Sequence, residues 1–230
     1  MKTIGLIGGT TWVSTIEYYR LLNEAVAEKL GGSNSAKIIL YSINFAELQL
    51  SGNYVPWNNI AQILTDAAKK LQNAGADCIL ICANTLHIVA DDVQRNINIP
   101  LIQLTEATAQ EIRSMGLSKV ALLGTKATME NDFYKVKLVQ NGIETIIPNE
   151  TEREIIQHSI FAELGKNLFK AETKEKYLSI IQNLVNSGAQ GIILGCTEIP
   201  LLIKQSDCPV PAFDTTKIHV SAGIKFALGE

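Results

Sequence analysis

A cysteine followed by two polar residues gives the sequence its strongest sign of chemistry. Cys196 follows the apolar run 191–194 after one glycine and precedes Thr197, Glu198 and Pro200. Because proline is tolerated in a first helical turn, we expect a helix to begin here, and a helix N-terminus lowers the pKa of a thiol. The Glu198 carboxylate opposes that effect. A free cysteine is more often a small buried residue, but this polar turn favours an acid or base at Cys196.

Three other polar turns also follow apolar runs. Backbone amides at helix starts bind anions, and hydroxyl and carboxamide groups add specific hydrogen bonds. Each of these residues could simply cap a helix, but four such turns at one edge of parallel strands favour a binding site for a carboxylate ligand. The four turns are Gly8-Gly9-Thr10-Thr11, Cys82-Ala83-Asn84-Thr85, Gly124-Thr125 and Gly195-Cys196-Thr197-Glu198.

The remaining cysteines and the histidines do not suggest a metal site. Cys78 lies in the middle of an apolar run and is expected in the core, whereas Cys208 precedes a proline in a loop. Cys78 and Cys82 would point to the same face of one strand, about 13 Å apart at the usual strand rise. The histidines show no metal-ligand spacing among themselves; they are His87, His158 and His219.

Composition and charge exclude several classes of protein. The 230 residues are 47% hydrophobic, which is enough for one α/β domain or two small ones. A net charge of −3 gives no basic excess for nucleic acid, and no apolar run reaches the roughly 18–20 residues of a membrane span. Gly5, Gly8 and Gly9 do not give the Gly-x-Gly-x-x-Gly spacing of a dinucleotide site. Four cysteines in a chain of this length predict a cytoplasmic protein with reduced thiols.

Short apolar runs alternate with stretches of helical periodicity, which predicts a parallel sheet with right-handed crossovers. Helices are expected over 58–74, which Gly75 would end, over about 175–187, and from a capping box at Ser14 toward Leu30. The expected strands are 3–7, 37–43, 78–82, 101–104, 119–123, 144–147, 191–194 and 210–213.

The chain also repeats itself weakly. Residues 4–8 resemble 120–124, residues 75–80 resemble 188–193, and residues 100–102 resemble 211–213. Three similar offsets in the same order predict two α/β halves, 1–105 and 106–215, with a terminal helix at about 216–230 packing back on one of them. A ligand would then bind between the halves, at the carboxyl ends of the strands.

The sequence resembles the aspartate/glutamate/hydantoin racemase superfamily over essentially its whole length, and most closely the amino-acid racemase branch of that superfamily. That branch is typified by a first turn reading Gly-Gly-Met-Ser-Trp-Glu-Ser-Thr, which is here 8–15. Other matching pieces are 84–87, 123–125, 129–134, 195–198 and 214–219. The resemblance implies two pseudo-symmetric, Rossmann-like parallel-sheet halves with the active site in the cleft between them, and a homodimer.

The resemblance further implies chemistry without pyridoxal phosphate or metal. In the family, a cysteine from each half faces one side of the substrate Cα, one thiolate removing the proton and the other thiol donating one. Cys196 matches the second of these cysteines. Ala83 stands where the first is expected, and Cys82 lies one residue earlier, which reverses the side-chain direction along a strand. Cys82 could serve only if a tight turn redirects it, so slow or one-sided turnover is expected.

The matching positions also predict how the substrate is held. Asn84, Thr85 and Thr197 match residues that bind the substrate carboxylate or amine, together with Thr10, Thr125 and the Ala83 backbone. Glu198 would orient Cys196 or contact the ammonium group. The resulting hypothesis is a racemase of aspartate, glutamate or a related amino acid. Two alternatives stay open, a single-cysteine decarboxylase or isomerase of dicarboxylates and a non-catalytic amino-acid-binding protein.

Overall fold

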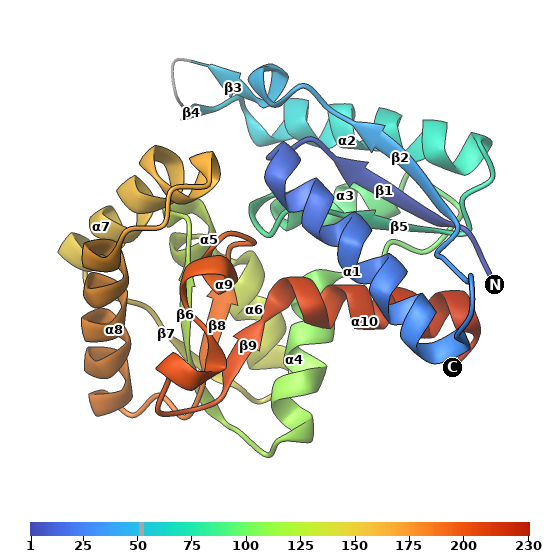
Figure 1. Ribbon diagram of the computed structural model, residues 1–230. Helices are drawn as coiled ribbons and strands as arrows, with labels where there is room; N and C mark the ends of the chain where they lie inside the picture. The colour runs from blue at the N-terminus through green and yellow to red at the C-terminus, as the bar shows by residue number, and fades with distance from the viewer. Residues whose placement is uncertain (51–52) are drawn as a thin grey trace. The chain divides into compact units, whose positions relative to one another are not determined.

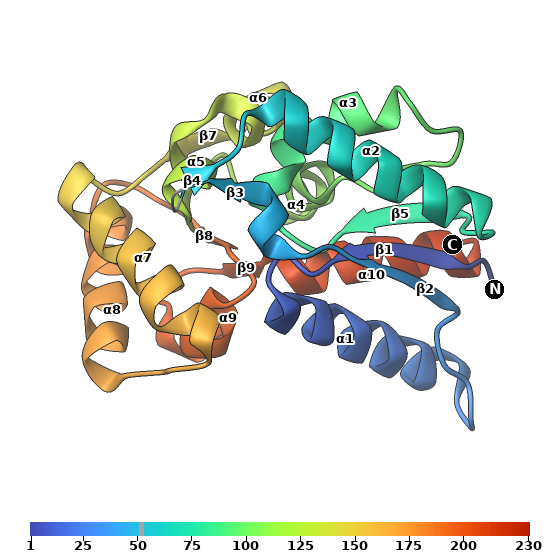
Figure 2. The same ribbon diagram turned by 90° about the horizontal axis from the view of Figure 1, so that it is seen from above.

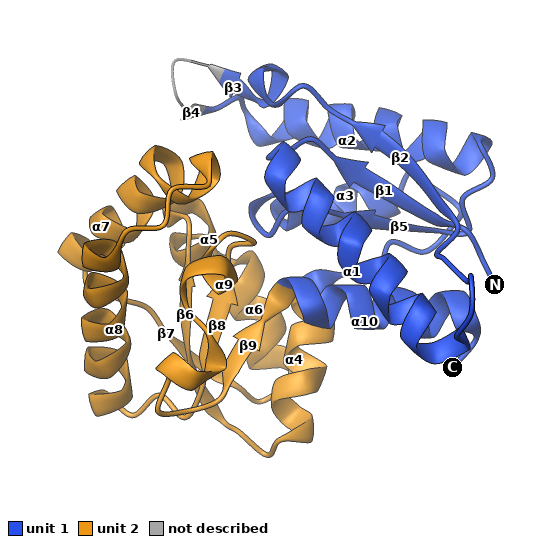
Figure 3. Ribbon diagram, viewed as in Figure 1, with its two compact units in different colours: residues 1–104, 216–230 blue, residues 105–215 orange. Residues whose placement is uncertain are grey.

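The computed structural model describes residues 1–50 and 53–230 and divides the chain into two compact units (Figure 3). Unit 1 holds residues 1–104 and 216–230, and unit 2 holds residues 105–215. Each unit is built on a parallel sheet with helices, which confirms the predicted α/β class with two parallel-sheet halves. Within the described residues, no helix has the length and apolar character needed to cross a membrane.

The sheet of unit 1 has the strand order β2-β1-β5, with every strand parallel to its neighbour. Parallel neighbours need crossover connections, which the helices between them supply. The elements of unit 1 are β1 (Ile4–Gly8), α1 (Trp12–Leu30), β2 (Ile38–Ser42), η1 (Phe45–Leu48), β3 (Gln49–Leu50), β4 (Asn53–Tyr54), α2 (Trp57–Asn73), β5 (Cys78–Ile81), η2 (Thr85–Val89), α3 (Ala90–Gln94) and α10 (Thr215–Leu228).

Helices cover both faces of this sheet, so successive side chains of one strand enter two different cores (Figures 1 and 2). On one face, Leu80 and Cys82 pack with residues of α1 and α10. On the other face, Ile81 and Ala83 pack with residues of α2 and α3. The alternation therefore continues past the end of β5 and sends Cys82 and Ala83 to opposite sides.

The sheet of unit 2 has the order β7-β6-β8-β9 and is also parallel throughout. Tyr134 on α6 bonds Thr108 on α4, and Tyr177 on α8 bonds Ser159 on α7 at 2.9 Å between oxygens. Figure 1 shows these two helix pairs on opposite sides of the strands. The elements of unit 2 are α4 (Leu104–Ser114), β6 (Lys119–Gly124), α5 (Lys126–Glu130), α6 (Asp132–Gln140), β7 (Glu144–Ile146), α7 (Glu150–Ala162), η3 (Leu164–Lys166), α8 (Ala171–Asn186), β8 (Ile192–Gly195), α9 (Ile199–Leu202), η4 (Gln205–Asp207) and β9 (Ala212–Asp214).

The two sheets place equivalent strands in the same order, as the sequence repeat predicts. In unit 1, Ile7 of β1 pairs with Ile81 of β5, and in unit 2, Leu123 of β6 pairs with Leu194 of β8. Two residues beyond these pairs lie Ala83 in unit 1 and Cys196 in unit 2. The register therefore makes Ala83 the equivalent of Cys196.

Two local predictions are wrong. The strand expected over 101–104 is a single bridge between Leu101 and Ile79, because α4 already begins at Leu104. The helix expected to begin at a Ser14 capping box begins three residues earlier, where Thr11 accepts a bond from the Ser14 amide. The Ser14 hydroxyl donates instead to the Cys82 carbonyl oxygen at 2.8 Å, so it ties α1 to the end of β5.

The long amphipathic helices match the prediction more closely. The helix expected over 58–74 is α2, which buries Ile60, Leu64 and Leu71 along one stripe. Gly75, with a φ of +96°, takes the left-handed conformation that ends such a helix. The helix expected over about 175–187 is α8, which begins a turn earlier than its apolar pattern indicates.

Unit 1 buries two histidines in neutral form. Burial lowers the pKa of His87 to about 4 and that of His219 to about 3, with the nearby His87 contributing to the second shift. In the unfolded chain both rings take up a proton near pH 6.5. The neutral rings therefore contribute stability that is fully present above pH 6.5. This stability is lost as the pH falls from 6.5 through the folded-state pKa values of the two rings.

This linkage predicts that acid destabilises the protein partly through His219. Replacing His219 with Gln should remove about one proton from the uptake on unfolding, and so flatten the pH dependence of the unfolding free energy by up to about 1.4 kcal/mol per pH unit between pH 6 and pH 4. Urea titrations across this range measure the slope. The exposed His158, replaced with Gln, serves as the control and should keep the wild-type slope. Equal slopes for wild type and H219Q would contradict the argument.

Candidate active site

The polar turn after β8 brings a thiol and a carboxylate together in unit 2. The Cys196 thiol donates a hydrogen bond to Oε2 of Glu198, with 2.9 Å between sulfur and oxygen. The Thr197 hydroxyl donates to the same oxygen at 2.7 Å. Cys196 is 8% exposed and Glu198 4% exposed. One buried carboxylate therefore accepts hydrogen bonds from two neighbouring side chains, one of which is the cysteine.

The surroundings of Cys196 favour the protonated thiol. Burial raises the pKa of Cys196 well above its ordinary value, and the charge of Glu198 and its bond to the thiol raise it further. The backbone amides of Thr197 and Glu198 act in the opposite direction but are outweighed. The expected lowering of the thiol pKa by a helix N-terminus is therefore wrong, because α9 has only four residues and a carboxylate adjoins the sulfur. The resting cysteine is therefore held as a thiol that donates its hydrogen bond to Glu198.

The turn after β6 lies beside the Cys196 turn in the sheet, because Gly124 pairs with Gly195. A Cβ on Gly124 would lie 2.8 Å from the Gly195 carbonyl oxygen, so the close approach of these two strand ends requires glycine. Thr125 follows and caps α5, its hydroxyl oxygen accepting from the Thr128 amide at 3.1 Å. The structure thus shows Thr125 as a helix cap, which is the alternative to a role in ligand binding.

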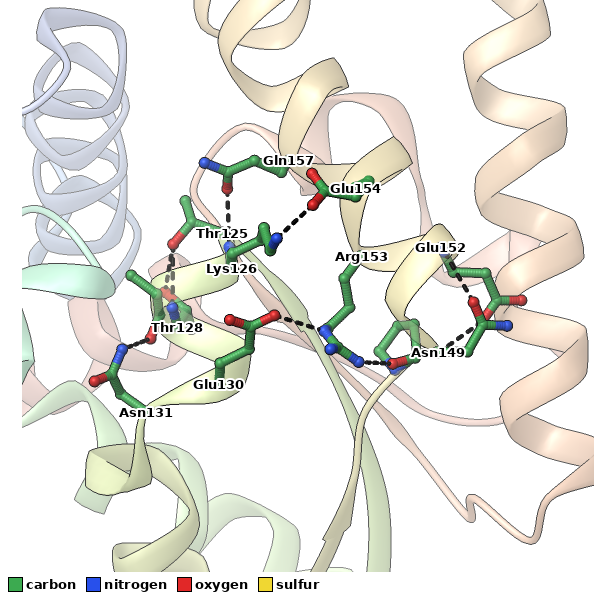
Figure 4. Close-up of polar contacts among 12 residues, drawn as sticks. Thr125, Lys126, Thr128, Glu130, Asn131, Asn149, Glu152, Arg153, Glu154 and Gln157 are labelled. Atoms are coloured by element: carbon green, nitrogen blue, oxygen red, sulfur yellow. Dashed lines mark hydrogen bonds and ion pairs between the residues drawn. The ribbon is translucent and has the colours of Figure 1, made fainter. Parts of the chain in front are cut away.

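Figure 4 shows how the start of α5 is tied to α7. The Lys126 amide donates to Gln157, and the Lys126 ammonium pairs with Glu154. Arg153 pairs with Glu130 at 2.8 Å across the same two helices. These contacts leave the Thr125 turn little freedom, so the end of β6 is a rigid neighbour for Cys196.

In unit 1, the turn after β1 is shaped by a close backbone approach. Gly9 has a φ of +85°, and a Cβ there would lie 2.0 Å from the Ile43 carbonyl oxygen. The Gly9 amide donates to the Thr15 hydroxyl oxygen at 2.8 Å. The following residue, Thr10, is buried, and its hydroxyl oxygen has no hydrogen-bond partner within the described part of the chain.

The turn after β5 holds the residues predicted to complete the site. Asn84 and Thr85 are buried where η2 begins. The Ala83 carbonyl oxygen accepts a bond from Nδ1 of His87 at 2.8 Å. Cys82 is fully buried in the core with α1 and α10, and burial raises the pKa of its thiol. Its side chain therefore points away from the side on which Ala83 lies.

Sequence reasoning missed part of this arrangement. The sequence analysis gives His87 and His219 no role in the site, yet the structure buries both rings together in unit 1, with centroids 5.4 Å apart. For His87, its position two residues after Thr85 could have indicated a place beside the turn. Among the described residues, no three histidine, cysteine or acidic side chains gather as they would around a metal ion.

Comparison with known proteins agrees with this geometry. The chain is 46% identical to a candidate Asp/Glu racemase from Yersinia pestis, with a TM-score of 0.91, covering 99% of this chain and 100% of the other. It is 43% identical to an aspartate racemase homologue from Pyrococcus horikoshii, with a TM-score of 0.86 and the same coverage. It is also 23% identical to the broad specificity amino-acid racemase RacX of Bacillus subtilis, over 69% of this chain and 68% of RacX.

The sequence profile of one family matches residues 7–223, which span both units. The solved relatives at 46% and 43% identity each match over 99% of this chain. The chain belongs to the Asp/Glu/Hydantoin racemase family.

Proposed function

We propose that this protein is an amino-acid racemase that works without pyridoxal phosphate and uses Cys196 as the acid or base at the substrate Cα. The observation that carries the proposal is the 2.9 Å hydrogen bond between the Cys196 thiol and the buried Glu198 carboxylate. The substrate is an acidic amino acid, aspartate or glutamate, or a close relative. The aspartate racemase homologue and a glutamate racemase among the similar proteins support this class of substrate, whereas RacX is named a broad specificity amino-acid racemase.

The proton path begins at the thiol. For Cys196 to remove the α-proton it must first lose its own, and Oε2 of Glu198 lies at hydrogen-bond distance to accept it. The thiolate then takes the proton from Cα and becomes a thiol again. In the opposite direction, the thiol donates its proton to the carbanion and recovers one from the protonated Glu198. The Thr197 hydroxyl donates to the same Oε2 and so helps to hold the Glu198 side chain in place beside the thiol.

Binding is assigned to the polar turns. Asn84, Thr85 and Thr197 are proposed to hold the substrate carboxylate and ammonium groups. The buried Thr10 hydroxyl and the Thr125 turn are proposed as further contacts. Donors aimed at the carboxylate also stabilise the charge that develops when the α-proton leaves, which is usually a large part of such catalysis.

The second proton-transfer group is not Cys82 in this proposal. Its thiol is fully buried against α1 and α10, whereas Ala83 occupies the position equivalent to Cys196. Racemisation needs a proton donor and an acceptor on opposite faces of Cα. With alanine at that position, α-proton exchange should be much faster for one enantiomer than for the other. Racemisation, whose equilibrium constant is one, should be slow from both enantiomers.

Removing the Cys196 thiol should abolish the chemistry. C196A should lower α-proton exchange by at least about 10³-fold, the scale on which a general acid–base group contributes. Proton NMR in D₂O with each enantiomer of aspartate and glutamate measures the exchange. C208A removes a partly exposed cysteine that has no part in the proposed site and should stay within about twofold of wild type. Retained exchange in C196A would refute the role assigned to Cys196.

Glu198 should act on the reaction through the thiol. E198Q removes the negative charge that raises the pKa of Cys196, so the pH dependence of alkylation by iodoacetamide should move to lower pH. Exchange should fall by about 10²-fold, because the proton acceptor is lost. E144Q, which alters an exposed carboxylate of unit 2, is the control. An alkylation profile that stays in place or moves to higher pH would contradict the assignment.

A thiol at position 83 should supply the missing group. We expect A83C to raise the rate of racemisation at least about tenfold from either enantiomer, since a second acid–base group would then act on the other face. Chiral chromatography starting from each enantiomer measures the rate. A83S has a similar size but a much weaker acid and should keep the wild-type rate. An unchanged rate in A83C would show that another group already serves that face.

A further inference from the structure

A buried hydrogen-bonded chain in unit 1 ends at the turn proposed to bind the substrate. Tyr18 on α1 and His219 on α10 are joined by a bond of 2.8 Å between the tyrosine oxygen and Nδ1. Nε2 of His219 lies 2.7 Å from the Ile102 carbonyl oxygen. The His219 ring is therefore fixed at both nitrogens, by α1 on one side and by the segment after Leu101 on the other.

His87 packs edge-on against the His219 ring and forms hydrogen bonds to the Ala83–Asn84 turn. The two imidazole centroids are 5.4 Å apart and the rings are inclined at 74°. Nδ1 of His87 lies 2.8 Å from the Ala83 carbonyl oxygen, and the His87 amide donates to the Asn84 carbonyl oxygen at 3.0 Å. One residue thus holds the Ala83–Asn84 backbone by two bonds, one from its ring and one from its main chain.

These partners determine where the ring protons lie. A carbonyl oxygen only accepts, so His87 carries its proton on Nδ1 and His219 carries its proton on Nε2. Tyr18 then donates to Nδ1 of His219. Nε2 of His87 is buried and makes no hydrogen bond within the described residues. Whatever His87 contributes, it contributes through Nδ1 and through the packing of its ring.

We propose that His87 is a positioning residue for the reaction, which orients the Ala83–Asn84–Thr85 turn through Nδ1 while the His219 ring fixes its own orientation. The inference rests on the proposed function, because Asn84 and Thr85 are substrate contacts only there. A buried acceptor without a partner is costly. An apolar residue would avoid that cost, but only a donor at the Nδ1 position bonds the Ala83 carbonyl.

Two variants separate the two ring nitrogens. In H87N the amide group can place a donor near the position of Nδ1, whereas in H87Q the amide reaches toward the position of Nε2. We expect H87N to keep kcat/KM within about threefold of wild type, and H87Q to lower it at least about tenfold, chiefly through a higher KM. Equal losses in both variants, or better retention in H87Q, would overturn the proposal.

A second readout does not depend on catalysis. The backbone amide of residue 87 should exchange with D₂O faster in H87Q than in H87N, because the turn loosens when the side-chain bond to the Ala83 carbonyl is lost. Y18F, which removes the donor to His219, should also raise KM, whereas Y134F removes a comparable buried hydroxyl from unit 2 and should not. If the wild type exchanges no amino-acid α-proton, the proposed function fails, whereas amide exchange still decides whether His87 orients the turn. Equal amide exchange in H87N and H87Q would then overturn the proposal.

Discussion

The alternation of side chains at the end of a parallel strand decides which residues of this protein can do chemistry. β5 lies between two helix layers, so each step along the chain moves a side chain from one core to the other. Cys82 enters the core of α1 and α10, and Ala83 takes the direction that Cys196 takes in unit 2. A shift of one residue therefore puts alanine, and not cysteine, at the position of unit 1 that is equivalent to Cys196.

Around Cys196, burial and charge act together. Burial and the neighbouring carboxylate raise the pKa of the thiol, so in the proposed reaction the group begins the cycle as an acid and needs Glu198 to become a base. The glycines at 124 and 195 allow β6 and β8 to end close together, and the contacts between α5 and α7 hold the adjacent turn. In the proposed reaction, these contacts help to keep the sulfur of Cys196 at hydrogen-bond distance from the carboxylate of Glu198.

Much of this could be predicted from the sequence, because apolar runs and helical stripes report directly on burial. The strands β1, β2, β5, β6, β7, β8 and β9, the helix α2 and the equivalence of Ala83 with Cys196 follow from such patterns, whereas the short strands β3 and β4 do not. The start of α1 could not, because Thr11 and Ser14 are both good caps and only the bond from Ser14 to Cys82 decides between them. The raised pKa of Cys196 and the pairing of His87 with His219 depend on three-dimensional burial, which no local pattern contains.

The most direct test of the account follows the α-proton of each enantiomer of aspartate, glutamate and a wider set of amino acids in D₂O, with chiral analysis of the same samples. The account predicts exchange with inversion for at least one of them, and a clear difference in rate between its two enantiomers. Absence of exchange across the whole set would contradict it, and would leave a binding protein or a different single-cysteine reaction as the function of the Cys196 site.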